Sequence, residues 1–140
     1  MRSRAVFLLV ALAVVLTAVS PAGAQPELEF LGEEILPTGL QFEDTEVGGL
    51  SSMAYDAELD RYYVISDDQS VIDPARFYTF DLDVADGDLD PGDVVVADVT
   101  TLLDAGGLPF AAASFDPEGL ALTRDRELVI TSEGIATRLI

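Results

Sequence analysis

The sequence predicts an all-β fold: a partial β-propeller of about two four-stranded antiparallel blades belonging to a larger ring. Three observations predict it. Apolar residues come in short runs, mostly of period two, which is typical of strands. Gly, Pro and Asp interrupt these runs at turn-like joints. A hairpin-like segment occurs twice, at 48–68 and at 118–134, and a four-stranded unit repeated around an axis is a propeller blade.

The first five strands expected lie in the N-terminal two thirds of the chain. Alternating apolar residues and acids suggest the first. The next two flank the charged turn DAELD, which predicts a hairpin. The fourth and fifth are rich in aromatic and β-branched residues and flank a polar turn with Asp-Gly and Pro-Gly. These strands are expected at 27–35, 50–55, 62–66, 76–82 and 94–102.

The last three strands follow a long loop. Residues 104–117 contain Gly-Gly and two prolines, which argue against a continuous strand there. Strands are then expected at 119–123 and 128–132, around the tight turn RDRE, and at 136–140. The chain ends inside this third strand of the second unit, so we expect residues 25–140 to be the N-terminal part of a longer propeller domain.

The repeat aligns Leu50 with Leu120 and Ser66 with Ser132, which makes the second hairpin four residues shorter than the first. Each copy ends in Ser followed by an acid. Because equivalent strands of successive blades end on the same face of a propeller, we expect Asp67 and Glu133 to lie near each other.

The N-terminus has the pattern of a signal peptide. Two arginines precede an uncharged apolar run, and small residues at Ala22 and Ala24 suggest cleavage after residue 24. Residues 1–24 are therefore expected to be removed, and the protein to be exported to the periplasm or the extracellular space. An uncleaved anchor is the alternative, but the run is short for a bilayer, and no stable membrane insertion is expected after cleavage.

The mature chain would be strongly acidic. It carries five arginines, no lysine and 26 acids, a net charge of −21. Such a surface repels nucleic acid and anionic lipid and attracts cations. Solubility in high salt is an alternative reason for the same composition. With no Cys and no His, thiol catalysis, Ser-His-Asp hydrolysis and most zinc sites are excluded, and carboxylate oxygens favour a hard cation such as Ca²⁺.

Four stretches carry a family resemblance. GGLSSMAYDAELDRYYVISDD, PARFYTFDLD, FDPEGLAL and LVITSEG, all within residues 48–134, resemble the exported phytase-like family, also called "esterase-like activity of phytase". The resemblance implies a propeller-like all-β fold and hydrolysis of phosphoesters or esters. Members of the family are longer than this chain, and the β-propeller phytases bind Ca²⁺ through acids around a central cleft.

Acids at strand ends are the candidate metal ligands, since carboxylates supply the hard oxygens that Ca²⁺ prefers. Arg76, after a long loop, is the candidate phosphate-binding residue. The structural alternatives are that the acids accept hydrogen bonds within turns and that Arg76 forms an ion pair with a nearby Asp. The candidate metal ligands are Asp67, Asp68, Asp116, Glu118 and Glu133.

Together these features predict that the full-length protein is a metal-assisted hydrolase acting on a small anionic phosphoester, or on an ester. The alternative is a non-catalytic propeller that binds a ligand or partner, with calcium in a structural role.

Overall fold

Every regular element in the described part of the chain is a β-strand. The structure, a computed structural model, describes residues 28–134 and 138–139. The strands form three antiparallel sheets of two, four and three strands. The predicted all-β class is therefore confirmed, and the predicted four-stranded antiparallel unit is present once in full.

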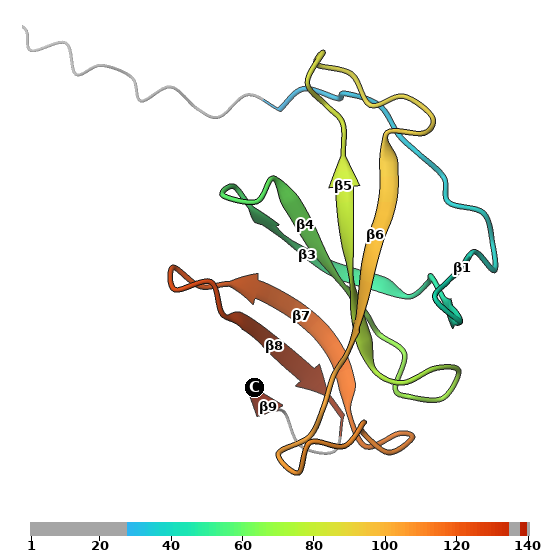
Figure 1. Ribbon diagram of the computed structural model, residues 1–140, viewed down its shortest axis with the longest axis vertical. Helices are drawn as coiled ribbons and strands as arrows, with labels where there is room; N and C mark the ends of the chain where they lie inside the picture. The colour runs from blue at the N-terminus through green and yellow to red at the C-terminus, as the bar shows by residue number, and fades with distance from the viewer. Residues whose placement is uncertain (1–27, 135–137, 140) are drawn as a thin grey trace, which may run out of the picture.

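The first sheet has four strands in the order β3-β4-β5-β6. They are β3 (Leu50–Asp56), β4 (Arg61–Ser66), β5 (Arg76–Leu82) and β6 (Val94–Thr101). The predicted bounds of these strands are right to within one residue. Figure 1 shows β5 and β6 running along the length of the molecule, with the β3–β4 hairpin crossing behind them.

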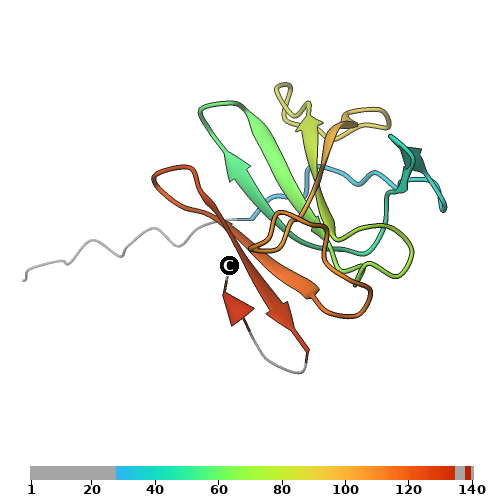
Figure 2. The same cartoon turned by 60° about the horizontal axis from the view of Figure 1, so that its bottom comes forward.

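The second sheet comprises β7 (Asp116–Leu122), β8 (Leu128–Glu133) and β9 (Arg138–Leu139). β7 begins three residues before the predicted strand, because Asp116 and Pro117 already pair with Glu133 and Ser132. Most of the strand predicted at 136–140 lies outside the described residues. The β3–β4 and β7–β8 hairpins lie side by side, with their tips on the same side of the molecule (Figures 1 and 2).

The strand predicted at 27–35 is wrong for its described part. Only a single bridge joins Gly32 to Leu89 there. The apolar side chains that suggested a strand meet no facing sheet, and Leu28, Phe30 and Ile35 are 95%, 81% and 83% exposed. A small sheet not predicted from the sequence follows instead, formed by β1 (Gln41–Phe42) and β2 (Thr45–Glu46).

The two long hairpins share a β-bulge at the same place. In the first, the register shifts between Leu50 and Ser52, and in the second between Pro117 and Gly119. Leu50 pairs with Ser66, and Pro117 pairs with Ser132. The structural equivalent of Leu50 is therefore Pro117, and the alignment of Leu50 with Leu120 is wrong by three residues.

The second hairpin is accordingly one residue shorter than the first, rather than four, counted between these paired residues. The repeat itself is confirmed, because the strand pairing and the bulge recur. A bulge adds a residue to one strand and turns its side chain out of the alternation. The bulged residues are Ser51 in the first hairpin and Glu118 in the second.

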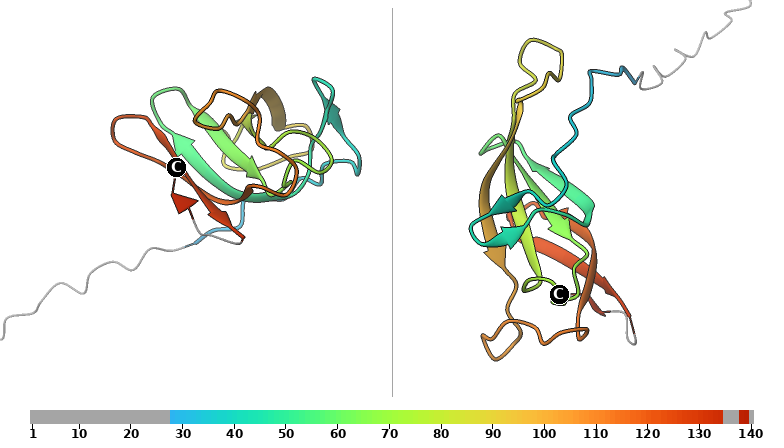
Figure 3. Two further views of the ribbon diagram at one scale, coloured as in Figure 1. Left: turned by 90° about the horizontal axis from the view of Figure 1, so that it is seen from below. Right: turned by 90° about the vertical axis from the view of Figure 1, so that its right-hand side faces the viewer.

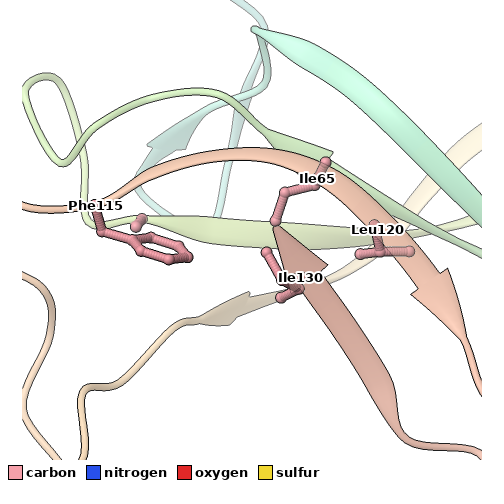
Figure 4. Packing of buried hydrophobic residues seen from close by; sticks show 5 residues of the cluster. Ile65, Phe115, Leu120 and Ile130 are labelled. Atoms are coloured by element: carbon pink, nitrogen blue, oxygen red, sulfur yellow. The ribbon is translucent and has the colours of Figure 1, made fainter. Parts of the chain in front are cut away.

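A hydrophobic core joins the two sheets. Ile65 from the first sheet packs with Leu120 and Ile130 from the second, and Phe115 closes one end (Figure 4). Polar contacts run alongside: the backbone N–H of Leu120 donates to Ser52 Oγ at 3.1 Å. Burial of these side chains, at about 1.5–3 kcal/mol each, is the main attraction between the sheets.

The opposite face of the first sheet has its own core. Val64, Tyr78 and Phe80 are buried there beneath Val47 and Phe42 from the β1–β2 segment. Figure 3 shows this segment on the side of the first sheet away from the second. The first sheet is therefore covered on one face by the second sheet and on part of the other face by the chain that precedes it.

Candidate functional site

Acidic residues lie at the open ends of both long hairpins, where β4 and β8 end and β7 begins. Asp67 directly follows β4, and its N–H donates to Gly49 O at 2.7 Å. Asp116 opens β7 and pairs with Glu133, the last residue of β8. Because both hairpins end in the same way, the repeat brings acids to the same end of both sheets, as the sequence predicts for Asp67 and Glu133.

Glu118 joins this group through the bulge. As the bulged residue of β7, it lies next to the bulged residue of β3, and Ser51 Oγ donates to Glu118 O at 3.1 Å. Pro117 beside it is fully buried and fixes the local backbone. A glycine at position 119 suits the close approach of β8, since a Cβ there would meet Thr131 Oγ1 and force that side chain to move.

The Glu118 carboxyl is sensitive to the charges around it. Partial burial raises its pKa above the ordinary value, and the carboxylates of Asp116, Glu133 and Asp67 raise it further. A neighbouring negative charge opposes ionisation in this way only at short range. We therefore treat these four residues, Asp67, Asp116, Glu118 and Glu133, as one feature, the acidic rim.

A pocket lies beside the acidic rim, with a volume of about 420 Å³. Thr131, Ser132 and Gly134 line it together with Glu118 and Glu133. Within the described residues, however, no three His, Cys, Asp or Glu side chains are grouped as they would be around a metal ion. The acidic rim offers hard oxygen donors and strong negative charge, but its own carboxylates do not converge on one point.

Asp68, next to Asp67 in the sequence, makes structural contacts. Its Oδ1 accepts the N–H groups of Val71 and Ile72, and its Oδ2 accepts the N–H of Asp73 and a guanidinium N–H of Arg76. Burial opposes ionisation of this carboxyl, but the four hydrogen bonds outweigh it and lower its pKa to about 2. These contacts occupy both oxygens, so they favour the turn interpretation of Asp68 over the metal-ligand one.

Arg76 is buried, with 2% of its side chain exposed. Its Nε donates to Tyr78 Oη at 2.6 Å, Nη1 to Asp68 Oδ2 at 2.9 Å and Nη2 to Glu46 O at 2.7 Å. Each guanidinium nitrogen is thus engaged within the fold. This geometry favours the ion-pair interpretation of Arg76 over phosphate binding.

Serines at the strand ends also serve the fold. Ser66 and Ser132 are buried, at 0% and 4% exposure. Ser66 Oγ donates to Gly48 O, and Ser132 Oγ accepts the N–H of Asp116. Ser66 therefore ties the end of β4 to the chain just before β3, and Ser132 ties the end of β8 to the start of β7, which explains why Ser precedes the acid in both copies.

Sequence reasoning missed the role of Ser51 and Ser52. Both contact β7, Ser51 through Glu118 O and Ser52 through Leu120. Two adjacent small polar residues at the start of an otherwise apolar strand were the available signal. Their meaning depends on the bulge, which the sequence does not mark.

No described segment forms a helix long and apolar enough to cross a membrane.

Among known proteins, the phytase-like family, described as esterase-like activity of phytase, matches residues 45–140. Neither a curated protein nor a solved structure gives a significant match. The matched region holds all strands of both large sheets and all four residues of the acidic rim. The chain therefore belongs to the phytase-like family.

Proposed function

We propose that the chain is part of an exported phosphoester hydrolase whose substrate site includes the acidic rim. The observation that carries this proposal is that three carboxylates from two equivalent hairpins, Asp67, Asp116 and Glu133, add to burial in raising the pKa of Glu118 beside a pocket of about 420 Å³. Membership of the phytase-like family supports the reaction class. An ester is the alternative substrate within the same class.

Such a site needs a cation to accept an anionic substrate. A phosphoester would be repelled by the acidic rim and by a mature net charge of −21. A divalent cation held by carboxylates reverses the local charge. Calcium suits these ligands because it takes several oxygens in flexible geometry. Since the described carboxylates do not group around one point, further oxygen ligands would have to complete such a site.

The propeller arrangement belongs to the same proposal. Repeated hairpins with matching bulges, packed side by side, are what successive blades of a ring require. In a ring, the acidic rim would face the central axis together with the corresponding ends of further sheets, which would supply those ligands.

The second candidate function is a non-catalytic binding module in which calcium has a structural role. The engaged guanidinium of Arg76 favours it, because that residue was the candidate phosphate ligand. The buried Ser66 and Ser132 favour it too, since neither offers an accessible nucleophile.

Calcium titration by calorimetry tests the site, with p-nitrophenyl phosphate and phytate hydrolysis as the functional readout. Glu118→Gln combined with Glu133→Gln should weaken calcium binding at least about tenfold, because it removes two rim charges. Asp88→Asn combined with Asp90→Asn is the matched control: it removes two exposed charges from the 85–93 turn. Equal loss in both variants would reject the acidic rim as the site. Calcium binding without hydrolysis would favour the binding module.

A further inference from the structure

Asp67 is an exposed acid held between two buried residues. Ser66 before it is fully buried, and its Oγ donates to Gly48 O at 2.8 Å. Asp68 after it has only 8% of its side chain exposed. The Asp67 N–H donates to Gly49 O at 2.7 Å. The backbone of Asp67 is therefore fixed on both sides, although its side chain lies in solvent.

The Asp67 carboxylate lies against Gly49, just before the first hairpin begins. A Cβ added to Gly49 would meet Asp67 Oδ1, and the φ of Gly49 is +60°, so this position suits glycine for two reasons. Two residues further along, Ser51 Oγ donates to Glu118 O at 3.1 Å. The contact with Gly49 thus keeps the Asp67 carboxylate beside the chain that leads into the bulge next to Glu118.

The Asp68 side chain shapes the loop that follows Asp67. Its Oδ1 accepts the N–H groups of Val71 and Ile72 at 2.9 and 3.2 Å, and its Oδ2 accepts the N–H of Asp73 at 2.8 Å. Three successive backbone donors are therefore bound by one carboxylate. Such bonds between a side chain and the backbone fix the course of a loop, so a change at Asp68 changes how the chain leaves Asp67.

Arg76 anchors this loop to the first sheet. Its Nη1 donates to Asp68 Oδ2 at 2.9 Å and to Pro74 O at 3.2 Å, and its Nη2 donates to Glu46 O at 2.7 Å. A buried ion pair adds little stability over a well-packed apolar pair, because both charges lose their hydration. Its directional bonds, in contrast, specify one arrangement of the groups around it. The pair is therefore better suited to placing the loop than to stabilising the core.

From these contacts we propose that Asp68 and Arg76 are positioning residues of the acidic rim. Their ion pair fixes the loop at 67–75, and the fixed loop holds the Asp67 carboxylate against Gly49. The exposed acid is then pre-organised, so it loses little conformational entropy when it contacts a ligand. This role rests on the proposed function in taking the acidic rim as the substrate site, but its test needs neither a metal nor a substrate.

NMR on the isotopically labelled chain, without added metal, tests this role. Three-bond couplings from Asp67 Cγ to the backbone N and carbonyl C report the χ1 rotamer of Asp67. In the wild-type chain one rotamer should hold at least about 80% of the population, and in Asp68→Asn its share should fall below about 50%. Hydrogen exchange is the second readout: protection of the Asp67 amide should fall at least about tenfold more than protection of the inner amides of β4.

Two variants calibrate the result. Gly49→Ala obstructs the carboxylate directly, so it should change the couplings of Asp67 while the ion pair stays intact. Arg126→Gln breaks the ion pair with Asp56 at the opposite ends of the hairpins. It destabilises the fold without touching the loop at 67–75, and it should leave the Asp67 rotamer unchanged.

A milder variant keeps the test decisive if Asp68→Asn does not fold. Arg76→Lys keeps the charge but loses the forked donor geometry, and it should shift the Asp67 rotamer in the same direction. Circular dichroism shows which variants are folded.

Three results would overturn the proposal. The first is an Asp67 side chain that already averages between rotamers in the wild-type chain. The second is a folded Asp68→Asn chain, or in its place a folded Arg76→Lys chain, with wild-type couplings. The third is an Arg126→Gln chain that shows the same change as Asp68→Asn. Calcium binding by the wild-type chain decides the proposed function separately, so the failure of one is distinguishable from the failure of the other.

Discussion

Replacing Asp68 with Asn tests the buried network around Arg76. The substitution removes the charge that faces a guanidinium with 2% exposure. The pKa of Asp68 falls from 3.8 to about 2 on folding, and a shift of that size corresponds to about 2 kcal/mol. Breaking a buried ion pair costs about 3–5 kcal/mol. Because Asn keeps an oxygen for the N–H groups of Val71 and Ile72, we expect a loss of about 2–3 kcal/mol.

Urea denaturation at two pH values measures this loss and its sign. Asp68 is more acidic in the folded state, so its contribution is complete above pH 3.8 and disappears as pH falls toward about 2. The gap between wild type and Asp68→Asn should therefore be full near neutral pH and should shrink in strong acid. Comparing the two proteins at each pH cancels most of the effect of the other carboxyls.

The exposed neighbour Asp67 provides the control. Asp67→Asn removes the same charge one residue away and should change stability by less than about 0.5 kcal/mol. A stability of Asp68→Asn within about 0.5 kcal/mol of wild type would refute the reasoning. So would a gap that stays constant with pH, because the network would then not depend on the ionised carboxyl.

Three further substitutions test the contacts that hold the hairpins. Ser52→Ala leaves a backbone N–H of β7 without its acceptor and should cost about 1–2 kcal/mol in urea denaturation, whereas an unchanged midpoint would argue against this bridge. Arg126→Gln removes the cation that lies 2.8 Å from the buried Asp56 carboxylate. Because Arg126 is partly exposed, we expect the free energy of unfolding to fall by about 1 kcal/mol. A double-mutant cycle with Asp56→Asn should show that the two side chains are coupled. Gly49→Ala should destabilise the fold by at least about 1 kcal/mol, because Gly49 has a φ of +60° and the new Cβ would meet the Asp67 carboxylate. Thermal melting measures this loss, and a stabilised variant would contradict it.

Local sequence patterns predicted most of the first sheet. β5 is predicted to the residue and β6 to within one, because aromatic and β-branched residues fill both and polar turn residues bound them. The segment predicted at 27–35 also alternates apolar and acidic residues, but its described part, residues 28–35, forms only one bridge. Period-two alternation indicates which side chains could share a face, but pairing depends on what the rest of the fold places opposite.

The candidate site was predictable only in part. The repeat predicted that Asp67 and Glu133 lie at one end of the sheets, because equivalent strands end together. The bulge that brings Glu118 to them has no sequence mark, since one inserted residue looks like a change of register. The contacts of Arg76 depend on Glu46 O, thirty residues away, so its direction could not be read from its own segment.

A carboxyl NMR titration of Glu118 tests the central claim, that two equivalent hairpins gather their acids into one electrostatic unit. In the wild-type chain, the pKa of Glu118 should lie above the ordinary value of 4.5. It should move toward that value when Asp116→Asn and Glu133→Gln remove neighbouring charges. A Glu118 pKa that does not respond to these substitutions would contradict the account.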